Sequence, residues 1–128
     1  MPDKFTVEII SPDHTILKQE TNEVIIPSFE GLMGILNNHI PLITFLRPGI
    51  ITIKAEGEKK YYAEEGTVEF SNNNLLILTS TAKDVADLDK SQINDLIQKA
   101  EANLNAQSTD KERYVASYKL ETLKEISQ

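Results

Sequence analysis

Hydrophobic and polar positions follow two different periods along this chain. In the first part, short apolar or alternating runs are separated by glycine, proline and asparagine turns, at residues 5–10, 23–26, 50–53, 60–63, 67–70 and 75–79. Short runs with turn residues between them are typical of an antiparallel sandwich or barrel. We therefore expect a strand over each of these ranges.

From residue 84 onward the apolar positions recur at helical spacing. Two stripes result, the first of Ile93, Leu96, Ile97, Ala100 and Leu104 and the second of Ala116, Leu120 and Leu123. Asp89 with Gln92 has the spacing of a capping box at a helix start. Thr109 with Glu112 repeats that spacing after a polar break at Gln107–Ser108. We expect a helical hairpin with about 17 residues in each arm.

Glycine and proline divide the chain in the same way. All 5 prolines and all 5 glycines lie at or before Gly66, and both residue types mark turns and are disfavoured inside helices. We predict a mainly β plus α fold, with an N-terminal antiparallel β-sandwich at residues 1–86 and a C-terminal helical hairpin at residues 87–128. Two amphipathic helices this short need the sandwich or a partner to pack on.

The segment between the predicted strands, residues 30–49, is harder to assign. Gly31 and Gly34 stand where unusual backbone angles are expected, so the residues by themselves indicate a loop. His39 precedes an apolar stretch that begins at Pro41. A single histidine in such a place is more often a hydrogen-bonded structural residue than a ligand.

Composition and charge exclude several classes of function. Cysteine is absent, which excludes disulfides and thiolate chemistry, and the net charge of -7 disfavours binding to nucleic acid. Phosphate-binding loops, serine-hydrolase elbows and zinc-protease motifs are also missing from the sequence. Glu64 and Glu65 are neighbours on a strand, so they point to opposite faces and are expected to be solvated. We expect no catalytic residue, no metal site and no cofactor.

Residues 30–49 nevertheless combine several fixed spacings. The pattern E-G-x-x-G-I at residues 30–35 is followed by His39, by P-L-x-T at residues 41–44 and by a P-G turn at residues 48–49. With Glu65–Phe70, Thr79–Ala82 and Asp87–Asp89, this segment resembles the epsilon subunit of rotary F-type ATP synthases, called delta in mitochondria. The resemblance covers nearly the whole chain, and its order of strands and then helices is the order predicted above.

The resemblance implies a non-catalytic central-stalk subunit of the rotor. Such a subunit couples proton flow through the c-ring to ATP synthesis, and its C-terminal helices inhibit ATP hydrolysis. The sandwich would bind the gamma subunit and the c-ring, and the helices would reach the beta subunit. The implied contacts with the c-ring are Glu30, Gly31, Leu32 and Met33. The implied contacts with gamma are His39, Pro41 and Thr44.

Two further expectations concern the helices. In the family, basic residues of the second helix face an acidic segment of beta, which places this role on Arg113 and Lys124. Some bacterial members bind ATP through an I/L-D-x-x-R-A signature, of which this chain keeps Asp89 but has Gln92 in place of the arginine. Glutamine lacks the cationic fork that phosphate recognition favours. We therefore interpret Asp89 as a helix cap and expect weak or absent ATP binding.

The resemblance also implies a location and competes with two other interpretations. The protein would lie at the cytoplasmic face of the bacterial inner membrane, peripheral and held there only through the complex, and it would bind no nucleic acid.

The alternative is a free-standing β-sandwich binding module. A sugar-binding module is disfavoured, because aromatic residues make up only 6% of the chain and tryptophan is absent. A small enzyme using Asp/Glu chemistry would need a convergent carboxylate pair, and the spacing predicts none.

Overall fold

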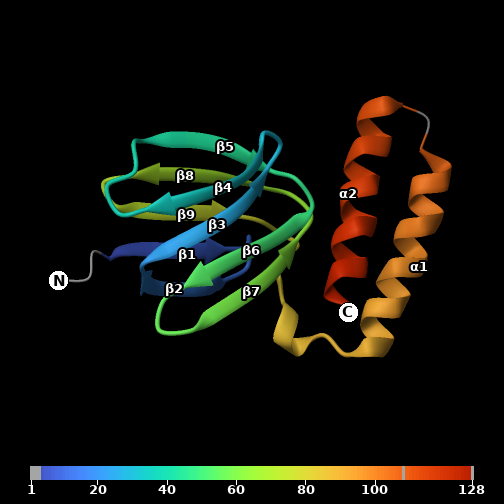
Figure 1. Cartoon of the computed structure of the whole chain (residues 1–128), viewed down its shortest axis with the longest axis horizontal. Coiled ribbons are helices and arrows are strands. Elements are labelled where there is room, and N and C mark those ends of the chain that lie inside the picture. The colour runs from blue at the N-terminus through green and yellow to red at the C-terminus, as the bar shows by residue number, and fades with distance from the viewer. Residues whose placement is uncertain (1–3, 108, 128) are drawn as a thin grey trace.

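The computed structural model describes residues 4–107 and 109–127, and Figure 1 shows a curled sheet beside a pair of antiparallel helices. Ser108, part of the polar break expected between the helices, lies outside these residues. The strands are β1 (Phe5–Ile10), β2 (Thr15–Thr21), β3 (Glu23–Ser28), β4 (Gly31–Leu36), β5 (Leu42–Leu46), β6 (Gly49–Lys54), β7 (Glu58–Ala63), β8 (Gly66–Ser71), β9 (Asn74–Leu78) and β10 (Lys83–Asp84). A 3-10 turn, η1 (Val85–Asp87), leads to helices α1 (Lys90–Ala106) and α2 (Asp110–Ile126).

The strands form one continuous sheet that wraps into a sandwich. Their order is β10-β7-β6-β3-β5-β8-β9-β1-β2, and β4 pairs with β3 outside this path. The ladders are antiparallel, except that β1 runs parallel to β9 with Thr6 opposite Asn74. This parallel ladder joins the first strand of the chain to the ninth. The expected sandwich followed by a helical hairpin is confirmed.

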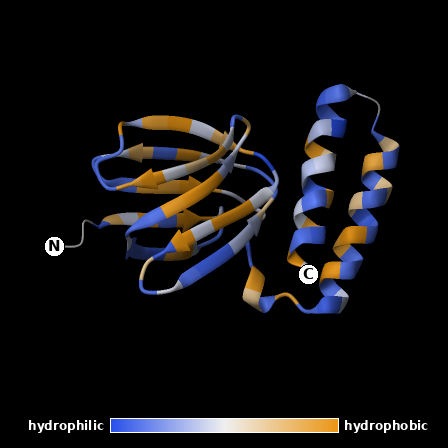
Figure 2. Ribbon diagram, viewed as in Figure 1, coloured by the Kyte–Doolittle hydropathy of each residue, from blue (hydrophilic) through white to orange (hydrophobic). Residues whose placement is uncertain are grey.

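The core of the sandwich follows from alternation along the strands. On β1, Phe5, Val7 and Ile9 are buried while the residues between them are half-buried. Figure 2 shows hydrophobic segments on most of the strands. Because successive side chains point to opposite faces of a strand, one apolar residue in two suffices to fill the interior. The sandwich core is therefore built almost entirely from residues before Ala86.

The expectation that residues 30–49 form a loop is wrong for most of that range. Residues 31–36 form β4 and residues 42–46 form β5. Their apolar residues do not alternate with polar ones, so the usual signal of a half-buried strand is missing. Gly34 sits inside β4 opposite Ile25 of β3. Pairing with β3 and β8 thus overrides the local signal of the glycines.

The helical hairpin agrees closely with its expected form. Each helix has 17 residues, and α1 begins with a complete capping box between Asp89 and Gln92. Buried Ala100 and Leu123 pack with Tyr62 of β7 in a second apolar cluster, separate from the sandwich core. In Figure 1, α2 lies next to the sandwich, and α1 lies on the side of α2 that faces away from the sandwich. Neither helix, within the described residues, is long and apolar enough to cross a membrane.

Candidate functional site

The most exposed apolar side chains of the sandwich belong to β4, β5 and the loop between them. We call this set the β4–β5 apolar surface; it consists of Leu32, Leu36, Ile40, Ile43 and Phe45. Ile40 and Ile43 are 74% and 75% exposed, and Leu32 is 70% exposed. Single exposed apolar residues are common, but five within one short segment mark an interaction surface.

Strand geometry explains why these side chains point outward. On β4, Leu32 and Leu36 are exposed, whereas Ile35 is fully buried and Met33 packs against the core. A strand that is apolar on both faces is normally covered on both faces. Among the described strands, β4 pairs only with β3, so it also leaves one edge open. The outer face of this segment is thus suited to a protein partner.

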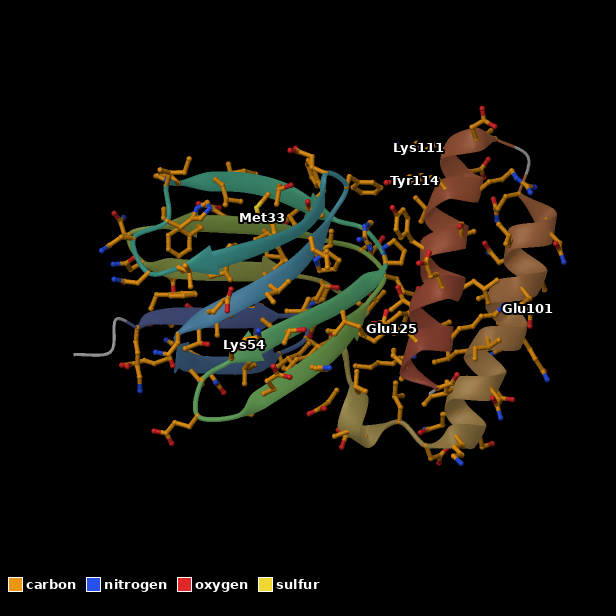
Figure 3. The ribbon with its side chains drawn as sticks, viewed as in Figure 1. Met33, Lys54, Glu101, Lys111, Tyr114 and Glu125 are labelled. Atoms are coloured by element: carbon orange, nitrogen blue, oxygen red, sulfur yellow. The ribbon has the colours of Figure 1, made fainter. Side chains whose placement is uncertain are left out.

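Hydrogen bonds of the Ser28 side chain stabilise the turn between β3 and β4. The Ser28 hydroxyl donates to the Gly31 carbonyl at 2.7 Å and accepts from the Glu30 amide at 3.2 Å. Gly31 has a φ of +118°, which other residues rarely adopt. The turn presents Glu30 and Leu32 to solvent, whereas Met33, labelled in Figure 3, faces inward. Of the two apolar residues expected in the docking segment, Leu32 is the exposed one.

The residues expected near gamma occupy the next part of the segment. Nδ1 of His39 donates to the Ile40 carbonyl at 2.7 Å, and its ring meets Phe70 edge-on at 5.9 Å. This contact supports the structural interpretation of the histidine. Pro41 is exposed, and Thr44 is half-buried opposite Val68 of β8. Both residues border the β4–β5 apolar surface.

A polar contact that the sequence did not reveal joins α2 to β7. The buried Tyr62 hydroxyl donates to Glu64 Oε2 at 3.0 Å, and Lys119 Nζ lies 3.3 Å from the same oxygen. Burial and the Glu64 carboxylate raise the pKa of the Tyr62 phenol well above its usual range. The expectation of a solvated Glu64 is therefore wrong, because the packed helix half-buries it. Glu65 does diverge from it and accepts from the Ser80 hydroxyl at 3.2 Å.

A second contact between α2 and the sandwich is aromatic. We call Phe29, Arg47, Tyr114 and Tyr118 the aromatic clasp. Phe29 stacks on Tyr114 with ring centroids 6.3 Å apart, and Tyr114 meets Tyr118 edge-on at 4.8 Å. The Arg47 guanidinium lies 4.0 Å from the centre of the Tyr118 ring. The spacing of the two tyrosines places them on one helix face, but no sequence pattern links them to Phe29 or Arg47.

A wide groove lies beside the clasp, between the edge of the sandwich and α2. Its volume is about 1160 Å³, and its apolar lining includes Ile10, Phe29, Phe45, Leu78 and Val115. Lys111 stands at this groove and projects from α2 toward the sandwich in Figure 3. Because Phe45 belongs to both, the groove continues the β4–β5 apolar surface toward the hairpin.

The remaining predicted residues lie on the hairpin. Arg113 and Lys124 are exposed, and neither forms an ion pair with any residue that the structure describes. Asp89 accepts from the Gln92 amide at 2.8 Å, and the Gln92 side chain accepts from the Asp89 amide at 3.0 Å. The interpretation of Asp89 as a helix cap is confirmed.

The chemistry of these surfaces is that of docking between proteins. Within residues 4–107 and 109–127, no three histidine, aspartate or glutamate side chains gather in a way that could hold a metal ion. The prominent features are instead an outward apolar surface, a rigid turn and a helical hairpin held by few side chains. Each can form contacts with another protein without a reacting group.

The chain is similar to known proteins over its full length. The family described as "ATP synthase, Delta/Epsilon chain, beta-sandwich domain" matches residues 4–85. The ATP synthase epsilon chain of Pelagibacter ubique is 45% identical over 99% of this chain and 100% of its own length. That of Parvibaculum lavamentivorans is 31% identical over 98% of this chain and 97% of its own length.

Solved structures share the fold at lower identity. A chain in the Euglena gracilis mitochondrial ATP synthase has a TM-score of 0.81 at 21% identity, covering 100% of this chain and 84% of that chain. A chain in the central stalk and c-ring structure of the Tetrahymena thermophila mitochondrial ATP synthase has a TM-score of 0.69 at 16% identity, covering 96% of both chains. At these identities, the likeness establishes a common architecture of sandwich and helical pair.

Proposed function

Because the chain belongs to the epsilon chain family of ATP synthases, whose members are non-catalytic subunits, we propose that as a central-stalk subunit it couples proton flow through the c-ring to ATP synthesis. Family membership favours this role over a free-standing binding module or an Asp/Glu enzyme. The observation that carries the proposal is the β4–β5 apolar surface on a sandwich built from one continuous sheet. A rotor adaptor needs a stiff body with an exposed docking face, and this sandwich has both.

The c-ring contact in this proposal is the β3–β4 turn, with Glu30, Gly31, Leu32 and Met33. Glu30 supplies a charge and Leu32 an exposed apolar side chain, while Gly31 and Met33 position them. The Ser28 hydrogen bonds support this assignment, because a turn that is already ordered loses little conformational entropy when it docks.

The gamma subunit would cover the adjoining part of the β4–β5 apolar surface. His39, Pro41 and Thr44 border this surface, and Ile40, Ile43 and Phe45 would supply most of the buried apolar area. Complexes formed in this way would place the protein at the cytoplasmic face of the bacterial inner membrane. It would be peripheral there, and held through its partners alone.

The hairpin would carry the regulatory part of the function. Arg113 and Lys124 are solvent-exposed on α2 and available to an acidic segment of the beta subunit. Contacts of α2 with that segment would inhibit ATP hydrolysis. They require α2 to leave the sandwich, where polar and aromatic side-chain contacts hold it.

Substitution of Leu32 by aspartate tests the docking assignment. Leu32→Asp places a charge on an exposed position, so the melting temperature should stay within about 3 °C of wild type, as for other surface changes. In inverted vesicles carrying the assembled enzyme, ATP-driven proton pumping should fall relative to ATP hydrolysis. Gln98→Glu adds the same charge at an exposed position of α1 and serves as the control. Normal coupling in Leu32→Asp would contradict the assignment.

A further inference from the structure

We propose that the aromatic clasp links the β3–β4 turn to the helical hairpin, so that docking at the turn and release of the hairpin influence each other. The inference rests on the proposed function in one respect, namely that the turn docks on the c-ring. The link itself is a property of this chain alone. It follows from the position of Phe29, which stands directly before Glu30 in the turn and stacks on Tyr114 of α2.

Both sandwich residues of the clasp are anchored at the same strand end. Phe29 follows β3 directly, and the Arg47 amide donates to the Pro27 carbonyl of β3 at 3.0 Å. Ser28 of β3 pairs with Leu46, the residue before Arg47. Contacts therefore run from the turn through the two tyrosines to Arg47 and back to β3. A displacement of α2 is transmitted to the turn from two sides.

The clasp residues depend on α2 for partners. Phe29 and Tyr114 are each 42% exposed while they stack, so neither is held inside a core. Arg47 Nη1 donates to the Pro48 carbonyl at 3.1 Å, but buried Nε has no hydrogen-bond partner in the described part of the chain. The Tyr118 ring covers this guanidinium. If the hairpin left, Phe29 would lose its stacking partner and Arg47 its aromatic cover.

The direction of the influence follows from these losses. A seated hairpin restrains Phe29 and with it the neighbouring Glu30, which adds to the order that the Ser28 hydrogen bonds give the turn. By reciprocity, a partner that binds the ordered turn holds the hairpin on the sandwich by the same factor. One aromatic pair corresponds to a factor of roughly two to ten in an equilibrium. Binding at the turn would thus oppose release of α2.

Amide hydrogen exchange on the full-length protein tests the link without any partner. Tyr114→Ala should speed exchange at residues 29–32, and Phe29→Ala should speed exchange along α2, each by roughly twofold to tenfold. In the double variant, the exchange rates at residues 29–32 and along α2 should be no faster than in the single variants. Glu121→Ala, at an exposed position of α2, and Leu32→Ala, in the turn itself, are the controls. The proposal would be overturned if each substitution changed exchange only at residues close to it in the sequence.

Binding to the purified, detergent-solubilised c-ring of the same organism tests the docking part. Wild type should bind roughly two to ten times more tightly than Tyr114→Ala, while Glu121→Ala should bind as wild type does. Equal affinities of wild type and Tyr114→Ala would overturn the influence on docking. Absence of binding by the wild type itself would contradict the proposed function, and the exchange measurements would still decide whether the turn and the hairpin are linked.

Discussion

At the scale of single residues, the contact between Tyr62, Glu64 and Lys119 ties helix α2 to the sandwich. Tyr62 is fully buried, yet its hydroxyl reaches the half-buried Glu64 carboxylate. A buried hydroxyl without a partner would be costly, so the carboxylate satisfies it while Lys119 balances the charge. The contact is specific to the seated hairpin, because Lys119 belongs to α2.

The raised pKa of Tyr62 predicts how stability depends on pH. The unfolded chain ionises this phenol near pH 10, whereas burial keeps it protonated in the folded protein. Its contribution to stability is therefore complete below about pH 10 and is lost as pH rises further. Tyr62→Phe should make the decline of the unfolding free energy between about pH 10 and 11 shallower, by up to ~1.4 kcal/mol per pH unit. Urea unfolding of both proteins across that range, with Tyr118→Phe as control, measures the difference.

Gln92 carries a second prediction at this scale. Its side chain accepts from the Asp89 amide and completes the capping box of α1. A residue engaged in this way, and without a charge, offers no strong contact to a phosphate. Isothermal titration calorimetry of the isolated protein should therefore show no saturable ATP binding below about 1 mM. Tight binding would show that another cation takes the role of the missing arginine.

At the scale of elements, the helices were far more predictable than the strands around the docking surface. The spacing of apolar residues and the capping residues of α1 and α2 determined both helices closely, since these signals are local. β4 and β5 were not predicted, because their outer faces are also apolar, as a partner surface requires. The alternation of apolar and polar residues that marks a strand is therefore missing. The aromatic clasp could not be predicted because Phe29 and Tyr114 lie far apart in the sequence and only the tertiary fold brings them together.

The separation of the two apolar clusters predicts different behaviour of the isolated parts. Residues 1–86 contain nearly all of the sandwich core and should show β-type circular dichroism with a cooperative thermal transition. Residues 87–128 lose Tyr62 and Ile50, on which the hairpin packs, and should be mostly unfolded. A cooperative transition in the isolated residues 87–128 would contradict the role of the sandwich as their support.

At the scale of the whole molecule, the hairpin lies against one end of the sandwich through side chains rather than shared strands. Stacking, one ion pair and a small apolar cluster hold it there. The stacking and the ion pair are individually weak, so the apolar cluster is the main contact that a partner of α2 would have to replace. Arg113 and Lys124 are already exposed in the seated state, so an acidic surface can attract α2 before the helix leaves the sandwich.

Removing these two charges predicts a change in regulation. Arg113→Ala combined with Lys124→Ala should raise the ATP hydrolysis rate of the assembled enzyme while leaving its assembly intact. Added salt should narrow the difference from wild type, because it screens exposed charges over about 10 Å at 0.1 M. Lys111→Ala, which removes a charge at the groove instead, is the matched control. Equal hydrolysis rates in the double variant, the wild type and an enzyme lacking residues 87–128 would show that these helices do not regulate.

The parallel ladder between β1 and β9 has a consequence for folding during translation. Thr6 must find Asn74, so the first strand leaves the exit tunnel long before its partner is translated. At roughly 5–20 residues per second, β1 waits several seconds with one backbone edge bare. Such an edge invites pairing with another nascent chain. The antiparallel hairpin with β2 shields the opposite edge early, and pairing of β1 with β9 is left as a late, non-local step of folding.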